Sequence, residues 1–257
     1  MIQERILYED NHLIIVNKMP SEITQGDKTG DEPMGEAVKR YLKEKYDKPG
    51  NVFLGVVHRL DRPVSGAVIF ARTGKALARM NAMLQKREIR KVYWAVCIGP
   101  QFAVRSSHNP PPSVPPPFSN GGGQGESSWI SLSDYLKKNE QQNKSYVYDE
   151  PGPGRLKAEL RYRQIASSDR YLLLEVELMT GRHHQIRAQL SAIGLTIKGD
   201  LKYGAPRSNP DGSIHLHSRL VEFRHPVSGA FISVTAPVPQ EKVWQLFNAD
   251  RSLDLPG

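Results

Sequence analysis

Residues 58–66, HRLDRPVSG, place a single carboxylate, Asp61, between Arg59 and Arg62, directly before a proline-containing turn. A cationic side chain close to an acid favours the ionised form, so we expect Asp61 to carry a negative charge. An ionised carboxylate beside cations can act as a nucleophile or a base toward a substrate that is held by its phosphates. A surface ion pair or an Asx turn produces the same pattern, so this segment alone leaves the structural and the catalytic interpretations open.

A second basic segment, GRHHQIR at residues 181–187, brings Arg182 and Arg187 to a turn and to the start of a helix. Arg187 follows His184 by about one helical turn, so the two side chains share a surface of that helix. The unpaired amide groups of a helix start also attract anions. A basic helix start with no further task is the alternative interpretation.

The histidines raise the question of a metal site. Five of the eight lie in the last third of the sequence, at His183 and His184, at His215 and His217, and at His225. The chain has one cysteine and neither the HExxH nor the CxxC spacing of common zinc sites. We therefore predict no metal site.

The positive charge of the chain is concentrated in one segment. The formal net charge is +8, and residues 51–100 carry nine basic and two acidic side chains, a net charge of +7. Clustered lysines and arginines bind a polyanion by displacing the counterions condensed on its phosphates. A solvated basic helix face is the alternative. The side chains that we expect to contact the polyanion are Arg59, Arg62, Arg79, Lys86, Arg87 and Arg182.

Length and composition exclude several classes of protein. The 257 residues are 39% hydrophobic and 24% charged, which is ordinary for a globular protein with a sizeable core. No apolar run approaches the roughly 18 residues of a membrane-spanning helix, and the first ten residues contain acids and lack the apolar region of a signal peptide. With Cys97 as the single cysteine, we expect a cytoplasmic protein without disulfides.

The elements that position these groups begin with a predicted hairpin, formed by strands at residues 6–8 and 13–17 around an Asp10-Asn11 turn. The apolar spacing then predicts a helix over residues 33–46, capped by Asp31, and a second helix capped by Thr73.

The remaining elements complete the predicted fold. We expect strands at residues 66–71, 91–98, 158–166, 171–178, 214–223 and 231–236, and a helix at 184–193 that ends before Gly194. Helices and hairpin-type strands alternate without a regular βαβ order. This order predicts an α+β fold with a mixed, mainly antiparallel central sheet and flanking helices.

Residues 105–128 interrupt this pattern with six prolines, four glycines and two formally charged side chains. Such a composition buries too little apolar surface to offset the entropy of ordering the chain. We predict an exposed, mostly disordered insertion, with a docking segment for a proline-binding partner as the alternative.

Several segments in order resemble the RluA-type pseudouridine synthase family. They are ILYEDNHLIIVNK at the start, HRLDRPVSG, KVYWAV at 91–96, GRHHQIRAQLSAIGLTIKGDLKYG at 181–204, LHSRLVEFRHPVSG, and TAPVP at 235–239. The resemblance covers residues 6 to about 239 apart from the insertion. Val64 and His183 depart from it, because the family has threonine at the first position and threonine or serine at the second.

The resemblance implies an enzyme that isomerises uridine to pseudouridine in RNA without a cofactor or metal. Asp61 would be the essential carboxylate, either a nucleophile at the anomeric carbon or a base at the neighbouring ribose carbon. Arg187 would pair with Asp61, and Tyr93 would stack on the uracil. Arg59 would fill the space that the uridine vacates when it is flipped out of its helix or loop.

The sequence therefore predicts a monomeric enzyme that acts on ribosomal or transfer RNA and consists of one catalytic domain over residues 1–257. We expect no amino-terminal S4-like module, because the family pattern begins within the first ten residues. A non-catalytic RNA-binding or ribosome-assembly factor is the main alternative, although binding alone requires neither Asp61 nor Tyr93. A metal-dependent nuclease would need clustered carboxylates that the sequence lacks.

Overall fold

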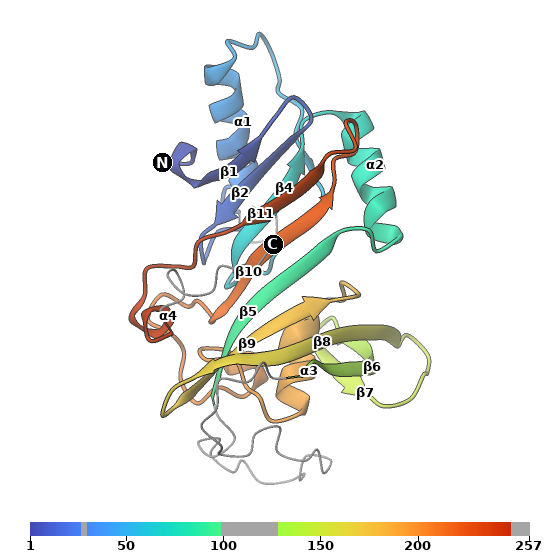
Figure 1. Ribbon diagram of the computed structural model, residues 1–257, viewed down its shortest axis with the longest axis vertical. Coiled ribbons are helices and arrows are strands. Elements are labelled where there is room, and N and C mark those ends of the chain that lie inside the picture. Colours follow the sequence, from blue (N-terminus) through green and yellow to red (C-terminus); the bar gives the residue numbers. More distant parts are fainter. Residues whose placement is uncertain (27–29, 99–127, 248–257) are drawn as a thin grey trace. The chain divides into compact units, whose positions relative to one another are not determined.

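The computed structural model describes residues 1–26, 30–98 and 128–247, which form two compact units (Figure 1). The first unit contains the described residues of 1–93, 211–213 and 217–247, and the second contains the described residues of 94–210 and 214–216.

The first unit is built on antiparallel neighbours. Strands β1 (Ile6–Glu9) and β2 (Leu13–Lys18) form a hairpin, and β2 pairs in turn with β4 (Ser65–Ala71). β4 also pairs with the short β3 (Gly55–Val56) and, in parallel, with β10 (Leu216–Arg224), whose other end pairs with β11 (Phe231–Thr235).

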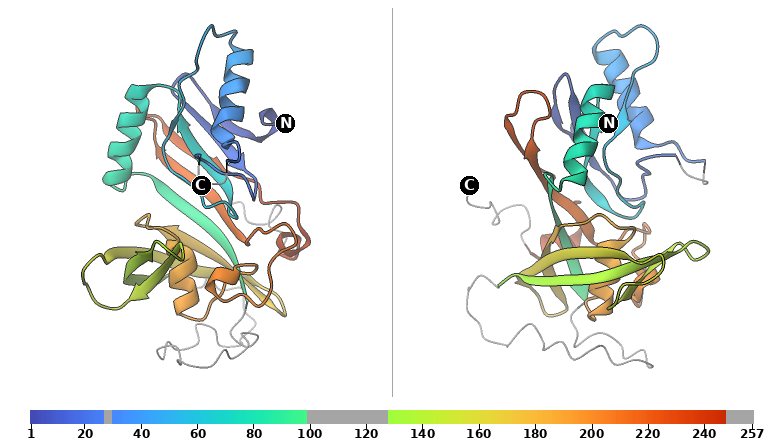
Figure 2. Two further views of the ribbon diagram at one scale, coloured as in Figure 1. Left: turned by 180° about the vertical axis from the view of Figure 1, so that it is seen from behind. Right: turned by 90° about the vertical axis from the view of Figure 1, so that its right-hand side faces the viewer.

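The first unit begins with a 3-10 turn at Gln3–Arg5. Its helices are α1 (Met34–Lys45), α2 (Gly74–Gln85) and the short α4 (Lys242–Gln245). Figure 2 shows α2 beside the strands, where its buried Ala76 and Met80 pack in a core with residues of β2, β4 and β10. The whole of β4 is buried, which explains why its sequence is a continuous apolar run without polar alternation.

The second unit is an antiparallel sheet packed with a helix. Its strands are β6 (Ile130–Asn139), β7 (Lys144–Tyr148), β8 (Leu156–Ser167) and β9 (Tyr171–Leu178), paired in the order β9-β8-β6-β7. Helix α3 (Gln185–Ala192) and the 3-10 turn Leu201–Tyr203 contribute to a small core with Leu136, Ala158, Ala188 and Tyr203. Strand β5 (Arg90–Ile98) begins in the first unit and continues into the second.

The predicted α+β class with a mainly antiparallel sheet is confirmed. The amino-terminal hairpin, the three predicted helices and the strands after residue 155 lie within a few residues of their expected positions. The Thr73 cap is also confirmed, because the Thr73 hydroxyl accepts a hydrogen bond from the Ala76 amide at 3.2 Å. The Asp31 cap is wrong: Pro33 precedes α1 without a side-chain cap, and Asp31 instead pairs with Arg62 at 2.6 Å.

Two further predictions, the disordered insertion and the single catalytic domain, stay predictions. The predicted insertion at 105–128 lies outside the described residues except for Ser128, and the single catalytic domain stays a prediction. Within the described ranges, no helix is both long and apolar enough to cross a membrane.

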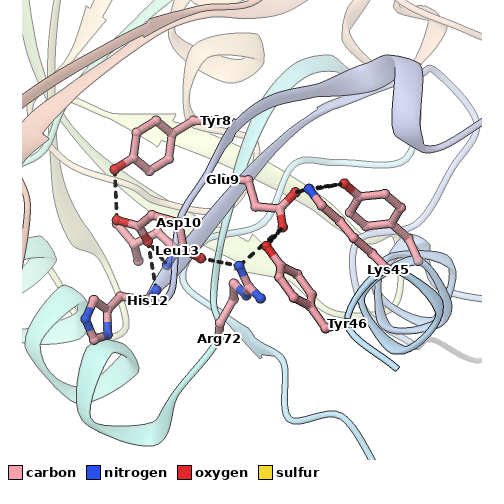
Figure 3. Close-up of polar contacts among 9 residues, drawn as sticks. Tyr8, Glu9, Asp10, His12, Leu13, Lys45, Tyr46 and Arg72 are labelled. Carbon is pink, nitrogen blue, oxygen red and sulfur yellow. Dashed lines mark hydrogen bonds and ion pairs between the residues drawn. The ribbon is translucent and has the colours of Figure 1, made fainter. Parts of the chain in front are cut away.

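The end of β1 carries a buried carboxylate with four donors, Glu9 (Figure 3). Its two oxygens accept hydrogen bonds from the Tyr41 and Tyr46 hydroxyls, at 2.9 and 2.7 Å, and contact Lys45 and Arg72, at 2.9 and 3.3 Å. Burial alone would raise the pKa of Glu9, but the hydrogen bonds from Lys45, Tyr46 and Tyr41 hold it below its ordinary value of 4.5. Glu9 therefore joins the hairpin to α1 and to the end of β4.

We expect the Glu9→Gln variant to lose about 1–3 kcal/mol of stability at pH 7, because the neutral amide offers no negative charge to Lys45 and Arg72 and cannot accept all four hydrogen bonds. The folded pKa of Glu9 lies below the unfolded value, so its contribution is present above pH 4.5 and is lost as the pH falls through the folded pKa. Urea unfolding of both proteins at pH 7 and at pH 3 should show the difference shrinking. The exposed Glu44→Gln variant is the control, and an equal difference at both pH values would contradict the prediction.

Candidate active site

A buried lysine, Lys18, holds the loop that carries Asp61. The Val64 amide donates to the Asp61 carbonyl at 3.0 Å and closes the turn. Lys18, at the end of β2, is fully buried, and its ammonium group donates to the carbonyls of Met19, Arg62 and Val64 at 3.1, 3.0 and 2.7 Å. Three donated protons thus fix the backbone on both sides of Pro63.

Lys18 also supplies charge close to Asp61. Burial lowers the pKa of Lys18 to about 8, against the opposing effect of the negative charges of Glu22 and Asp61. Lys18 is therefore mostly protonated at neutral pH. A fixed cation beside the Asp61 loop favours the ionised carboxylate that the sequence predicts.

Tyr93 lies in the same unit as Asp61. Its side chain is on the first half of β5 and is 6% exposed. Burial raises the pKa of Tyr93, the nearby Ser218 hydroxyl lowers it, and the negative charge of Asp61 raises it further. The structure thus brings the predicted carboxylate and the predicted aromatic residue within electrostatic reach, and the phenol stays protonated at neutral pH.

The same region depends on a close approach between β4 and β10. Gly66 has a φ of +115°, and a Cβ atom there would lie 2.3 Å from the Ser218 carbonyl oxygen. Only glycine allows the two strands to meet at this point. Next to it, the Ser65 hydroxyl bonds Nδ1 of His217 at 2.8 Å, and Nε2 of His217 donates to the Ala236 carbonyl at 3.1 Å.

The predicted RNA-contacting residues of the first unit are distributed over two elements. Arg59 is exposed and Arg62 is half-buried in the Asp61 loop. Arg79, Lys86 and Arg87 are exposed on α2 or directly after it, and Arg79 donates to the Pro226 carbonyl at 2.9 Å. Helix α2 contains no acidic residue, so its outer surface carries positive charge alone.

The second unit holds the other predicted residues. Arg182 is exposed, and its Nε donates to the Lys157 carbonyl at 2.9 Å. Arg187 lies in the buried first turn of α3 and makes a two-point ion pair with Asp200, through Nε at 2.7 Å and Nη2 at 2.8 Å. The predicted pairing of Arg187 with Asp61 stays a prediction, because these residues belong to different units.

Lys18 and Asp200 were missed by sequence reasoning. Each lies inside a segment that the family resemblance covers, Lys18 at the end of IIVNK and Asp200 in GDLKYG. A charged residue directly after an apolar strand or between two glycines was the available signal. It gave no indication of burial, because the partners of each residue come from other parts of the chain.

Several histidines are buried or contact other side chains. Burial is the main cause that lowers the pKa of His58 to about 3, and the positive charge of Lys91 contributes to the same shift. Burial also lowers the pKa of His217 to about 3. His183 and His184 stack with ring centroids 3.8 Å apart, and Nδ1 of His183 lies 2.9 Å from the Ser145 hydroxyl. In the part of the chain that the structure describes, no three His, Cys, Asp or Glu residues are grouped as a metal site would need.

Comparisons with known proteins define the class. The family model described as RNA pseudouridylate synthase matches residues 12–192, and the chain belongs to this family. The solved structure of human RNA pseudouridylate synthase domain containing 4 has the same fold, with a TM-score of 0.68 at 19% identity over 93% of this chain and 90% of that one.

Two curated relatives confirm the RluA-type resemblance. An uncharacterized RNA pseudouridine synthase of Synechocystis is 31% identical over 240 residues, which are 91% of this chain and 65% of the relative. Ribosomal large subunit pseudouridine synthase D of Xanthomonas campestris is 30% identical over 249 residues, with 92% of this chain and 66% of the relative covered. The chain thus spans just under two thirds of the length of these relatives.

We expect the Lys18→Met variant to be less stable by about 1–3 kcal/mol at pH 7, because it leaves buried carbonyls without their donor. Lys18 has a folded pKa of about 8 and an unfolded value of 10.5. Between these values the unfolded chain holds a proton that the folded chain has released, so stability rises with pH. Relative to the methionine variant, the parent protein should gain at most about 1.4 kcal/mol per pH unit in this window.

Denaturant unfolding of both proteins at pH 7, 8.5 and 10 measures this effect. The exposed lysine variant Lys43→Met is the control, and its difference from the parent should stay constant. If the parent and the Lys18→Met protein change in parallel over this range, Lys18 does not have the lowered pKa that its burial implies.

Proposed function

We propose that this chain isomerises specific uridines of RNA to pseudouridine. The observation that supports this proposal most directly is the geometry around Asp61 in a chain of this family. The carboxylate lies on a loop fixed by Lys18 and within electrostatic reach of buried Tyr93. A surface ion pair needs neither the buried lysine nor the aromatic neighbour.

The reaction exchanges one bond of the ribose for another. The bond from the anomeric carbon to ring nitrogen 1 breaks, the uracil turns, and the anomeric carbon bonds carbon 5. Carbon 5 loses its proton and nitrogen 1 gains one, so nothing is oxidised, reduced or hydrolysed. The proposed reaction therefore needs only groups that hold the base, stabilise charge and move a proton, and it runs without metal or cofactor.

The residues of the first unit suit these tasks. Asp61 acts as the nucleophile at the anomeric carbon or as the base at the neighbouring ribose carbon. Tyr93 offers a flat ring for the uracil, and stacking of this kind contributes about 1–3 kcal/mol per base. Because the phenol is held in its protonated form, its hydroxyl can donate a hydrogen bond. Arg59, which is exposed, fills the space left by the flipped nucleotide.

Arg187 is the proposed cationic partner of Asp61. A guanidinium group has five N–H donors, and the Asp200 pair uses those on Nε and Nη2. The resemblance to the family implies that Arg187 pairs with Asp61 as well. This role would keep Asp61 ionised during the reaction.

The basic side chains on and near α2 supply the proposed RNA contacts. Arg79, Lys86 and Arg87 are exposed there, and Arg182 is exposed in the second unit. We propose ribosomal or transfer RNA as the substrate and the cytoplasm as the compartment, with the monomer as the working form. The large-subunit synthase among the relatives makes ribosomal RNA the first substrate to test.

RNA binding should weaken steeply with salt, because each phosphate contact releases counterions. Reversal of two charges in the Lys86→Glu, Arg87→Glu variant should reduce the magnitude of the log-log salt slope by about 1–2 and leave unfolding unchanged. Filter binding between 50 and 300 mM salt measures the slope, at roughly the range where such contacts dominate. The control is the exposed pair Lys43→Glu, Arg170→Glu. An equal loss in both variants would assign the effect to net charge rather than to α2.

The Asp61→Asn variant separates an enzyme from a non-catalytic RNA-binding factor. The amide has nearly the same size as the carboxylate but cannot act as the nucleophile or base. Pseudouridine formation should fall below detection, while RNA binding stays within about tenfold, or 1.4 kcal/mol. Parallel isomerisation and binding assays on one ribosomal RNA fragment make the comparison, with the exposed Asp169→Asn variant as the control. Isomerisation by the asparagine variant at the parent rate would exclude Asp61 as the catalytic group.

A further inference from the structure

Arg187 and Asp200 form a deeply buried ion pair in the second unit. Their side chains are 6% and 1% exposed, and two hydrogen bonds of 2.7 and 2.8 Å join them side on. A guanidinium group and a carboxylate that meet in this way have one relative orientation, unlike a single contact that can swing. The pair therefore fixes the plane of the Arg187 guanidinium group.

The chain around Asp200 is shaped to present this carboxylate. Gly199 and Gly204 both have left-handed backbone conformations, with φ of +89° and +97°. The amides of Tyr203 and Ala205 both donate to the Asp200 carbonyl at 3.0 Å, so both hydrogen bonds of the turn end on the backbone of Asp200. A backbone that is tied down on the same residue leaves the Asp200 side chain little freedom to follow a moving partner.

Tyr203 supports the same guanidinium group from its ring face. The Arg187 Cζ atom lies 5.1 Å from the Tyr203 ring centroid, which is within the range of a cation–π contact. The buried Tyr203 hydroxyl in turn accepts the Ser145 amide at 2.8 Å and lies 3.1 Å from Nδ1 of His184. The ring is thus anchored to β7 and to the residue before α3.

We propose that Asp200, with Tyr203 behind it, is the positioning residue for Arg187. Its carboxylate offsets the charge of Arg187 at long range, so Arg187 acts at short range as an oriented cationic donor rather than as a general attractor of RNA. This inference rests on the proposed function and adds how the arginine of that function is aimed. Asp200 itself touches neither substrate nor reacting atoms.

A double-mutant cycle tests the proposal, with Asp200→Asn, Arg187→Met and the double variant. Asp200→Asn should lower kcat at least tenfold under saturating RNA, while the RNA Kd changes less than threefold. Because Asp200 acts through Arg187, the double variant should be no slower than Arg187→Met alone. The exposed Asp169→Asn variant should keep the parent kcat and Kd.

The outcomes separate this inference from the proposed function. An inactive parent chain on ribosomal and transfer RNA would reject the proposed function. An active parent with an unchanged kcat in Asp200→Asn, or with a double variant slower than Arg187→Met by the full Asp200→Asn factor, would overturn the positioning role.

Loss of folding is controlled separately. All rates are measured at least 15 °C below the thermal midpoint of each variant. If Asp200→Asn does not fold, the Arg187→Met, Asp200→Leu variant removes the whole buried pair, which proteins often tolerate. It should fold and match Arg187→Met in kcat, and a further drop beyond that variant would contradict the proposal.

Discussion

The burial of the Lys18 ammonium group is the constraint on which the geometry of the Asp61 loop depends. A lysine without solvent contact is costly unless donors and charge are matched. Here the matching groups are backbone carbonyls that flank the loop, at 2.7 to 3.1 Å. If the loop moved away, the Lys18 ammonium group would either become exposed or stay buried without its hydrogen-bond acceptors. The position of Asp61 is therefore coupled to the end of β2. That end is held in turn by its pairing with β4, where Lys18 lies opposite Gly66.

The second unit applies the same rule to an arginine. The guanidinium group of Arg187 is buried against a carboxylate and a tyrosine ring rather than against carbonyls. In both units the charged group is attached to a regular element, β2 or α3, and its partners come from a loop or turn. Groups that are held in this way keep their orientation better than groups on free loops. Neither pair contributes a net positive surface.

The sequence predicted those helices and strands whose apolar residues are regularly spaced along one face. The amino-terminal hairpin follows from an apolar strand beside a turn pair, and α2 follows from apolar spacing after Thr73. The strands β6 and β7 were not predicted, because their alternating polar residues and their position after a proline-rich segment resemble loop composition. The Asp31 cap failed for a different reason, since a tertiary partner, Arg62, competes for that carboxylate.

The roles of Asp61 and Tyr93 stay predictions, which the sequence suggested because a family pattern marks both residues. The buried Lys18 that holds the Asp61 loop was missed, because two of its three partners lie 44 and 46 residues away in the chain. Sequence spacing reports neighbours along a helix or strand, whereas burial of a charge is a property of the packed structure. Reading a charged residue at the end of an apolar strand as exposed is therefore the error to expect.

Burial also decides which quantity each cation controls. An exposed side chain such as Lys86 interacts through a high dielectric and is screened by salt, so its proposed contribution is to the encounter with RNA and to the affinity. A buried group such as Lys18 or Arg187 is already compensated by fixed partners and adds little long-range attraction, but its removal leaves those partners uncompensated. The net charge of +7 over residues 51–100 therefore overstates the groups available to RNA, because it counts the ion-paired Arg62 and buried Arg72 with the exposed side chains. Among its cations, exposure rather than charge separates the residues proposed to contact RNA from those that stabilise the fold.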